Sequence, residues 1–150
     1  MSDYDSTKDT LEHKGKVAYF IGLLIKELID RAMDHDNTKL KEPERTIFNE
    51  CTQKLATLTY NSKEYKECLE ALKPALDHHY ARNRHHPEHF PHGVKDMDLV
   101  DLIEMVADWK AAALRQTNGN ILKTIESNAT RFEYTQELST ILANTVKRFE

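Results

Sequence analysis

Hydrophobic residues recur through most of the chain at the spacing of an α-helix. The first such stripe consists of Val17, Ile21, Leu24 and Leu28. It runs to about Met33 and stops in the polar segment DHDNTKLKEPE, whose Asp, Asn and Pro residues favour turns. We therefore predict a long helix from about Thr10 to about Met33, after a flexible polar lead-in over residues 1–8.

The same spacing returns in five later segments. They cover residues 43–58, 65–80, 97–113, 122–125 and 138–146. Pro74 falls inside the second of them and indicates either a kink or a restart of the helix. Period-2 alternation does not persist anywhere, and the chain contains no internal repeat. The sequence predicts an all-α fold, a single compact domain of about six helices over residues 1–150.

Composition narrows the class of protein. Charged residues make up 31% of the chain and hydrophobic residues 39%, and the formal charge is −4. This charge disfavours nucleic acid as the main partner, and no apolar run reaches the roughly 18 residues of a membrane span. The start is acidic rather than signal-like, and Cys51 and Cys68 lack CxxC spacing, so we expect a cytoplasmic protein with reduced thiols. The wide apolar stripes leave room for a homodimer.

Six of the eight histidines fall between His78 and His92. On the helix that ends at Tyr80, the apolar positions 65, 69, 72 and 76 continue at 79, so His79 points inward and His78 toward the flank. A core histidine bonded to a backbone carbonyl is the simpler interpretation of His79 taken alone. The alternative is a metal ligand.

His35 and Asp36 lie at the end of the first stripe, which continues to position 35. A carboxylate can bridge two cations, whereas a neutral imidazole binds one. Lys39 follows three residues after Asp36 and adds a cation suited to a phosphate. The segment therefore predicts one half of a metal site.

Asp101, Glu104 and Asp108 share a helical face at positions i, i+3 and i+7. Such a face is usually a solvated acidic stripe. Asp108, however, lies between Val106-Ala107 and Trp109, and a carboxylate buried there requires a partner. A metal would supply one.

The irregular stretch over residues 83–95 is long enough for a functional loop. In it, His85, His86 and His89 flank Pro87-Glu88, and Arg82 and Arg84 lie alongside. In regular backbone, adjacent His85 and His86 do not easily reach the same ion. We expect one to bind metal and the other, like His89, to serve substrate or packing, while the arginines are suited to a phosphate.

The order His13, His35-Asp36, His79, His85 or His86, and Asp108 resembles the HD superfamily of metal-dependent phosphohydrolases, and HDNTK resembles its HD-x-(G/S)-K segment. From about His13 to Phe149 the chain also resembles a family of small phage and bacterial proteins, which brings no activity with it. The shared segments are HDNTKLKEPE, HHYARNRHHPEHF and DLIEMVADWKAA.

The resemblance implies an HD-like fold and a ligand set. His13, His35, Asp36 and Asp108 would hold one divalent ion (Mn, Fe, Mg or Zn). In the two-metal members a second ion is held by residues matching His79 and His85 or His86, bridged by the residue matching Asp36.

The implied function is a metal-dependent phosphohydrolase acting on a nucleotide or another small phosphorylated metabolite. Asp36, Lys39 and Glu104 would be its catalytic residues, with Glu104 as a proton shuttle or as a partner to a ligating histidine. Lys39, with Arg82 or Arg84, would contact the phosphoryl group, as would His86 and His89. Two alternatives remain: a phage-type module that sequesters a nucleotide without turnover, and a di-iron oxygenase of HD type.

His13 departs from this pattern. It precedes His35 by 22 residues, which is about 33 Å in one straight helix, too far to share a metal. Either the chain turns between Leu23 and Asp36 without a Gly or Pro to mark it, or His13 belongs to a different site, for example in a partner subunit.

Overall fold

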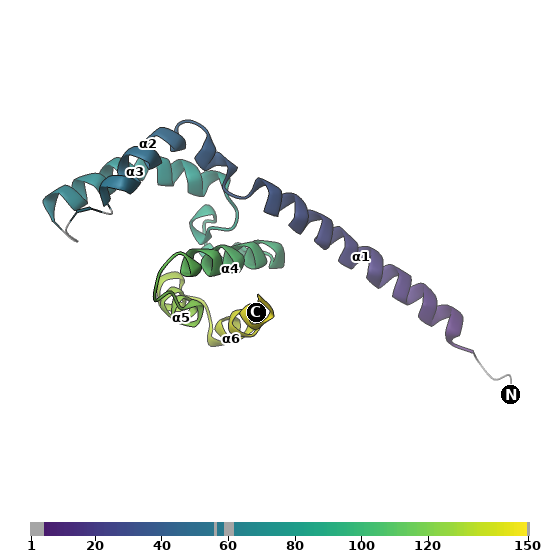
Figure 1. Cartoon of the computed structure of the whole chain (residues 1–150). Helices are drawn as coiled ribbons and strands as arrows, with labels where there is room; N and C mark the ends of the chain where they lie inside the picture. Colours follow the sequence, from purple (N-terminus) through teal and green to yellow (C-terminus); the bar gives the residue numbers. More distant parts are fainter. Residues whose placement is uncertain (1–4, 56, 59–61, 150) are drawn as a thin grey trace. The chain divides into compact units, whose positions relative to one another are not determined.

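A computed structural model describes residues 5–55, 57–58 and 62–149. Within these ranges the chain forms six α-helices and four short 3-10 helices and contains no strand, which confirms the predicted all-α class (Figure 1). The α-helices are α1 (Thr7–Asp34), α2 (Glu44–Leu55), α3 (Lys63–Arg82), α4 (Leu99–Leu114), α5 (Ile121–Phe132) and α6 (Gln136–Val146). The 3-10 helices are η1 (Asn37–Leu40), η2 (Pro87–His89), η3 (Gly93–Asp96) and η4 (Lys147–Phe149).

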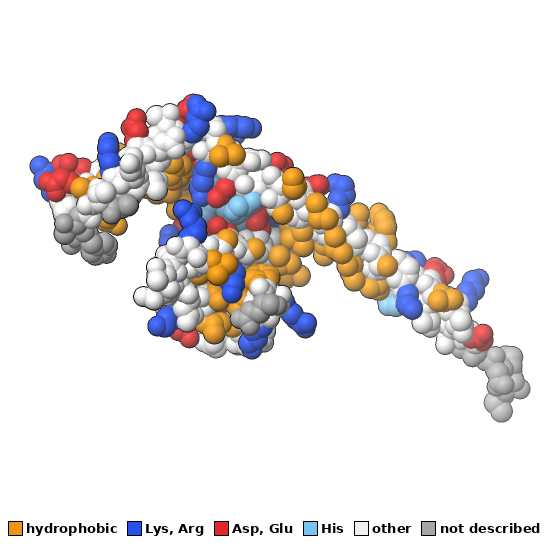
Figure 2. Space-filling view, viewed as in Figure 1, with side chains coloured by type: hydrophobic (Ala, Val, Ile, Leu, Met, Phe, Trp, Pro, Cys, Tyr) orange, Lys and Arg blue, Asp and Glu red, His pale blue; other side chains and the backbone are white. Residues whose placement is uncertain are grey.

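The contacts divide the chain into two units, Met1–Asp34 and His35–Glu150. In the first unit α1 is one unbroken helix of 28 residues, slightly longer at each end than the predicted one. Part of the predicted flexible lead-in, residues 1–4, lies outside the described residues. The helix buries none of its own residues, and apolar side chains follow it along its length (Figure 2).

In the second unit, α2 and α3 lie side by side (Figure 1). Cys51 and Cys68 are buried between them as free thiols, and the Cys68 thiol donates to the Cys51 carbonyl at 3.6 Å. The helix α3 continues through Pro74 as one element. Of the polar loop expected before it, residues 59–61 lie outside the described residues, while the Ser62 hydroxyl accepts a hydrogen bond from the Tyr65 amide and caps α3.

The helices α4, α5 and α6 enclose an apolar core. Its buried members are Met105, Val106, Ile125, Leu142 and Val146. The chain between α4 and α5 passes so close to the end of α4 that a Cβ atom on Gly119 would lie 1.8 Å from the Ala113 carbonyl oxygen. Glycine is the one residue that permits this approach.

Two faces of α4 serve different purposes. One face contributes Met105 and Val106 to the apolar core. A second face carries the three carboxylates that the sequence singled out, at positions 101, 104 and 108. The helix begins with a capping box in which Asp98 and Asp101 each accept a hydrogen bond from the other's backbone amide.

None of the helices within the described ranges combines the length and the apolar character that crossing a membrane requires.

Candidate metal centre

A tight turn after α1 presents Asp36 to the rest of the second unit. The helix ends at Asp34, and Asp36 has a φ of 58°, in the left-handed region, before η1 begins at Asn37. Aspartate tolerates this conformation better than most residues with a side chain. Within the second unit, Asp36 lies beside His79 of α3, and His35 lies beside Glu104 of α4.

The other candidate ligands come from three places in the same unit. His79 lies in the last turn of α3 and is 1% exposed. His85 and His86 follow in an irregular turn, where His85 is 2% exposed. Asp108 comes from α4. Imidazole side chains lie beside acidic ones where this cluster reaches the surface (Figure 2).

The Asp36 carboxylate lies between two sets of these side chains. Its Oδ1 atom is 3.2 Å from His79 Nε2 and 3.6 Å from His85 Nε2. Its Oδ2 atom is 3.6 Å from His35 Nε2, which is also 3.6 Å from Asp108 Oδ1. The two oxygens of one carboxylate thus face different partners.

Three groups of side chains in the described part of the chain bring possible ligand atoms within 4.8 Å of one another. They are Asp36 with His79, His85 and His86; His35 with Asp36 and Asp108; and His35 with His85 and Glu104. The first two share Asp36, so this carboxylate is placed to bridge two cations. Imidazole and carboxylate together suit Zn, Mn and Fe.

Two buried atoms test whether the cluster fits a cation. Within the described residues, neither Asp36 Oδ1 nor His85 Nε2 has a hydrogen bond, although they lie 3.6 Å apart. Buried polar atoms normally have partners, so this pair requires an explanation. A divalent cation bound by both atoms provides one.

Both His85 and His86 join the first group, whereas the sequence predicted that one of them would bind metal. The expectation assumed regular backbone. The chain instead turns over residues 84–86, and the two rings lie with centroids 4.1 Å apart. His86 Nε2 is 2.9 Å from His79 Nε2, so both rings direct the same kind of atom toward the cluster.

Glu104 contacts the rings of His35 and His85 on the side away from Asp36. Its Oε1 atom lies 2.9 Å from His35 Nδ1 and 3.0 Å from His85 Nδ1. A carboxylate accepts such bonds, so each ring donates from Nδ1 and turns Nε2 toward Asp36. Glu104 thus lies where the second of its two predicted roles, that of a partner to a ligating histidine, would place it, and the role stays a prediction.

A second carboxylate, that of Glu44, contacts His78 and His79 of α3, and the sequence did not predict it. It is fully buried at the start of α2, and its oxygens lie 2.6 Å from His78 Nδ1 and 2.9 Å from His79 Nδ1. The sequence gives no signal for this role, because an acidic residue in a first helical turn is ordinary.

The pKa values of several side chains in the cluster are strongly shifted. The carboxylates of Asp108 and Glu104 raise the pKa of His35 to about 10, despite burial. Burial and the neighbouring His85 and His79 lower the pKa of His86 to about 3, so this ring is neutral. Burial alone would raise the pKa of Asp36, but the neighbouring His79 and Lys39 hold it well below the usual range.

Lys39 lies at the edge of the cluster, as the sequence predicted. Its ammonium is 2.7 Å from Asp36 Oδ2 and 5.8 Å from the centre of the Phe48 ring. The side chain is 39% exposed, so a ligand that approaches from solvent can reach it.

Arg84, for which the sequence predicted a phosphate contact, binds a carboxylate of the chain itself. Its guanidinium binds Asp101 through two hydrogen bonds, of 3.0 Å from Nε and 2.8 Å from Nη2, and it lies 4.9 Å from the centre of the Phe90 ring. Asp101 is fully buried, so this pair anchors the histidine-bearing turn to α4. Arg82 is exposed at the last position of α3.

Three further histidines are held by other partners. His89, predicted to contact substrate, donates from Nδ1 to the Tyr80 carbonyl at 2.9 Å, near the end of α3. His92 lies 2.9 Å from Asp96 on the surface. His78 binds Glu44 on the flank of α3. None of the three occurs in the ligand groups found among the described residues.

His13 lies within α1, 21 residues before Asp34 and about 30 Å from it along the helix. The helix does not break between Leu23 and Asp34, so the predicted alternative of an unmarked turn there is wrong. His13 is absent from the three ligand groups within the described ranges. A separate site for His13 stays a prediction.

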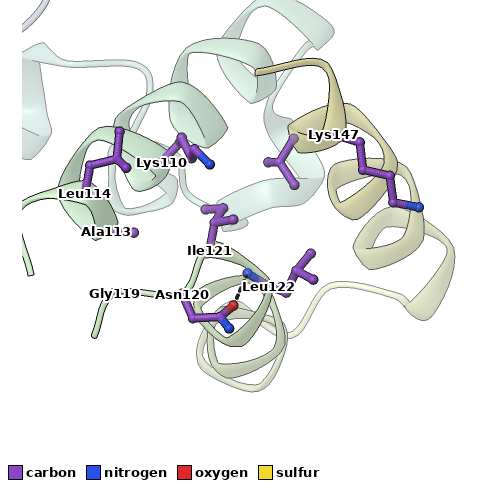
Figure 3. Close-up of a pocket in the computed structure, with 9 residues that line it drawn as sticks. Lys110, Ala113, Leu114, Gly119, Asn120, Ile121, Leu122 and Lys147 are labelled. Atoms are coloured by element: carbon purple, nitrogen blue, oxygen red, sulfur yellow. Dashed lines mark hydrogen bonds between the residues drawn. The ribbon is translucent and has the colours of Figure 1, made fainter. Parts of the chain in front are cut away.

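A separate cavity of about 280 Å³ lies where α4 ends and α5 begins (Figure 3). Two lysines flank an otherwise largely apolar lining, which holds no imidazole and no carboxylate. Its lining residues are Lys110, Ala113, Leu114, Gly119, Asn120, Ile121, Leu122, Val146 and Lys147. The cavity therefore does not share the chemistry of the histidine cluster.

A family model matches residues 2–149, which is nearly the whole chain. The chain therefore belongs to that family, which is described as a family of unknown function (DUF5662). No curated protein and no solved structure matches the chain.

Proposed function

We propose that this protein is a metal-dependent phosphohydrolase of HD type that acts on a nucleotide or another small phosphorylated metabolite. The observation that carries the proposal is the position of Asp36. Its two carboxylate oxygens face two different sets of possible ligands, and one of those oxygens is buried without a hydrogen bond in the described structure. The free buried thiols are consistent with a cytoplasmic protein.

His35, Asp36 and Asp108 would hold one ion, and His79, His85 and His86 would hold the second, with Asp36 shared. Two divalent ions bound there would lower the pKa of a water between them toward neutral and so supply a nucleophile for phosphorus. Because imidazoles predominate in the set, we expect Mn, Fe or Zn rather than Mg.

The chain's own residues provide the remaining requirements. Glu104 holds the rings of His35 and His85 by their Nδ1 atoms, so the two Nε2 atoms keep a fixed direction. Lys39 places an ammonium at the open edge of the cluster, where it would bind a phosphoryl oxygen and stabilise the charge that develops during transfer.

Metal analysis followed by a substrate panel tests the proposal. Protein purified without chelator should hold close to two divalent ions per chain and should release phosphate or pyrophosphate from some member of a nucleotide panel with added Mn²⁺. Asp36→Asn should abolish turnover, whereas His92→Gln, which changes an exposed imidazole outside the cluster, should leave it intact.

Three results would contradict the proposal. The first is a protein that binds no divalent metal and melts at the same temperature with or without chelator. The second is a protein that binds a nucleotide without forming product, which favours a sequestering module. The third is oxygen uptake by an iron-loaded protein with no hydrolysis, which favours an oxygenase.

A further inference from the structure

Glu44 is a fully buried carboxylate next to, but outside, the proposed ligand set. Its Oε1 atom accepts a hydrogen bond from His78 Nδ1 at 2.6 Å. Its Oε2 atom lies 2.9 Å from His79 Nδ1 and accepts a hydrogen bond from the Thr38 hydroxyl at 2.9 Å. One side chain thus joins η1, α2 and α3 behind the cluster.

The protons in this network have one consistent arrangement. Three possible donors lie at hydrogen-bond distance from the two Glu44 oxygens, namely His78 Nδ1, His79 Nδ1 and the Thr38 hydroxyl, which is the environment of an ionised carboxylate. An ionised carboxylate only accepts, so His79 must donate from Nδ1. Thr38 Oγ1 and Asn83 Nδ2 also lie 3.0 Å and 3.1 Å from His79 Nδ1, but their protons are engaged elsewhere. The Thr38 hydroxyl donates to Glu44, and the Asn83 amide nitrogen donates to the Thr38 hydroxyl at 2.9 Å and to the His79 carbonyl at 2.8 Å.

The consequence appears on the other side of the His79 ring. A neutral imidazole that carries its proton on Nδ1 has a lone pair on Nε2, which is the atom a metal requires. His79 Nε2 lies 3.2 Å from Asp36 Oδ1 and 2.9 Å from His86 Nε2, inside the four-residue ligand group. The Nδ1 atom of the His79 ring is therefore bound by Glu44, and its Nε2 atom faces the cluster.

We propose that Glu44 is a positioning residue that fixes His79 as the Nδ1–H tautomer and so presents its Nε2 atom to a divalent cation. The inference rests on the metal centre in the proposed function and adds a residue to it. Glu104 offers a comparison, because it also lies within 3.0 Å of two imidazole Nδ1 atoms. The cluster thus has a carboxylate support on each side, and metal-binding histidines commonly depend on such partners.

Glu44→Gln tests the inference in the full-length chain. The glutamine amide can donate to Nδ1, which favours the opposite tautomer, with the proton on Nε2. Long-range ¹H–¹⁵N NMR of the metal-free protein, with His79 assigned by comparison with His79→Gln, should show Nδ1–H in the wild type and a shift toward Nε2–H in the variant. Competition with a chromophoric chelator should show Zn²⁺ affinity about 10- to 100-fold weaker in Glu44→Gln.

His78→Gln is the matched control. It removes the other imidazole from Glu44 while leaving the Glu44–His79 contact in place, and the His78 side chain is itself 27% exposed. Both variants disturb the same buried carboxylate, so both should lower the melting temperature. Only Glu44→Gln should change the His79 tautomer and weaken Zn²⁺ binding, and equal weakening in both variants would contradict the inference.

The wild-type spectrum alone also decides the question if Glu44→Gln does not fold. A His79 ring protonated on Nε2 in the metal-free wild type would overturn the inference. Failure of the proposed function looks different. A protein that shows Nδ1–H on His79 and tight, Glu44-dependent Zn²⁺ binding, but hydrolyses no phosphorylated compound, would keep the role of Glu44 and remove the phosphohydrolase.

Discussion

The two faces of α4 bury side chains by different physical means. On one face, Met105 and Val106 pack with α5 and α6, where contact area matters more than direction. On the other face, Asp101 and Glu104 are held by directed bonds, to Arg84 and to the Nδ1 atoms of two histidines. The first arrangement tolerates changes that preserve volume, whereas the second depends on the position of individual atoms.

This difference separates stability from metal binding. A truncation in the apolar core should cost folding free energy and leave the ligand atoms where they are. A change of one atom in the cluster should cost metal affinity while the chain stays folded. The following variants test that separation.

Met105→Ala should have the largest effect on stability. Met105 is fully buried, and loss of its side chain should lower the free energy of unfolding by about 2–5 kcal/mol, through lost burial and the cavity left behind. Urea unfolding measures this change. The number of Zn²⁺ ions bound per folded chain should remain that of the wild type, and a lower number would show that the two faces of α4 are coupled.

Asp36→Asn should have the largest effect on metal binding. Asparagine tolerates the left-handed backbone at this position, so the turn should persist, but the variant lacks the anionic carboxylate that bridges the two ligand sets. We expect Zn²⁺ affinity to fall by about 100-fold or more. Residues that only hydrogen-bond to a metal ligand already contribute about 10- to 100-fold, and Asp36 is itself a proposed ligand. Chelator competition measures it, and an unchanged affinity would remove Asp36 from the centre.

Arg84→Met should affect both properties moderately. The change leaves Asp101 buried without its two guanidinium bonds and should lower the free energy of unfolding by about 1–3 kcal/mol. Because the pair anchors the turn that carries His85 and His86, Zn²⁺ affinity should fall as well. Arg84→Lys keeps the charge without the two-pronged geometry and should recover only part of each loss.

The pH dependence of the chelator-treated protein should report His35. The folded-state pKa of His35 is about 10, raised by Asp108 and Glu104, against 6.5 for the free side chain. The stability that this proton contributes is therefore complete below about pH 6.5 and is lost as the pH rises through 10. Urea unfolding at a series of pH values should show this decline, and His35→Gln should flatten it.

His92→Gln should have the smallest effect. His92 is exposed and pairs only locally, at i,i+4 with Asp96, so we expect a stability change within about 0.5 kcal/mol. Zn²⁺ stoichiometry and affinity should match the wild type. A weaker affinity would mean that the cluster extends beyond the residues assigned to it.

The apolar pattern predicted the helices because an apolar stripe at helical spacing is a property of a single element. Even α1 follows this pattern, although none of its residues is buried. The same periodicity predicted that His79 points inward, which its burial confirms. It could not show that His85 and His86 join one group, because their turn has no regular period. Nor could it reveal that Asp101 engages Arg84 or that Glu44 binds His79, because these pairs are 17 and 35 residues apart and depend on how the helices pack.

The left-handed turn at Asp36 limits what can replace this residue. Glycine would adopt the backbone conformation readily but offers no oxygen to the cluster. Glutamate keeps the carboxylate but adopts the left-handed conformation less readily, and its longer side chain places the oxygens one carbon further from the backbone. In a saturation library selected for metal binding, position 36 should therefore accept almost nothing but aspartate, and a library selected for folding alone should also admit asparagine and glycine.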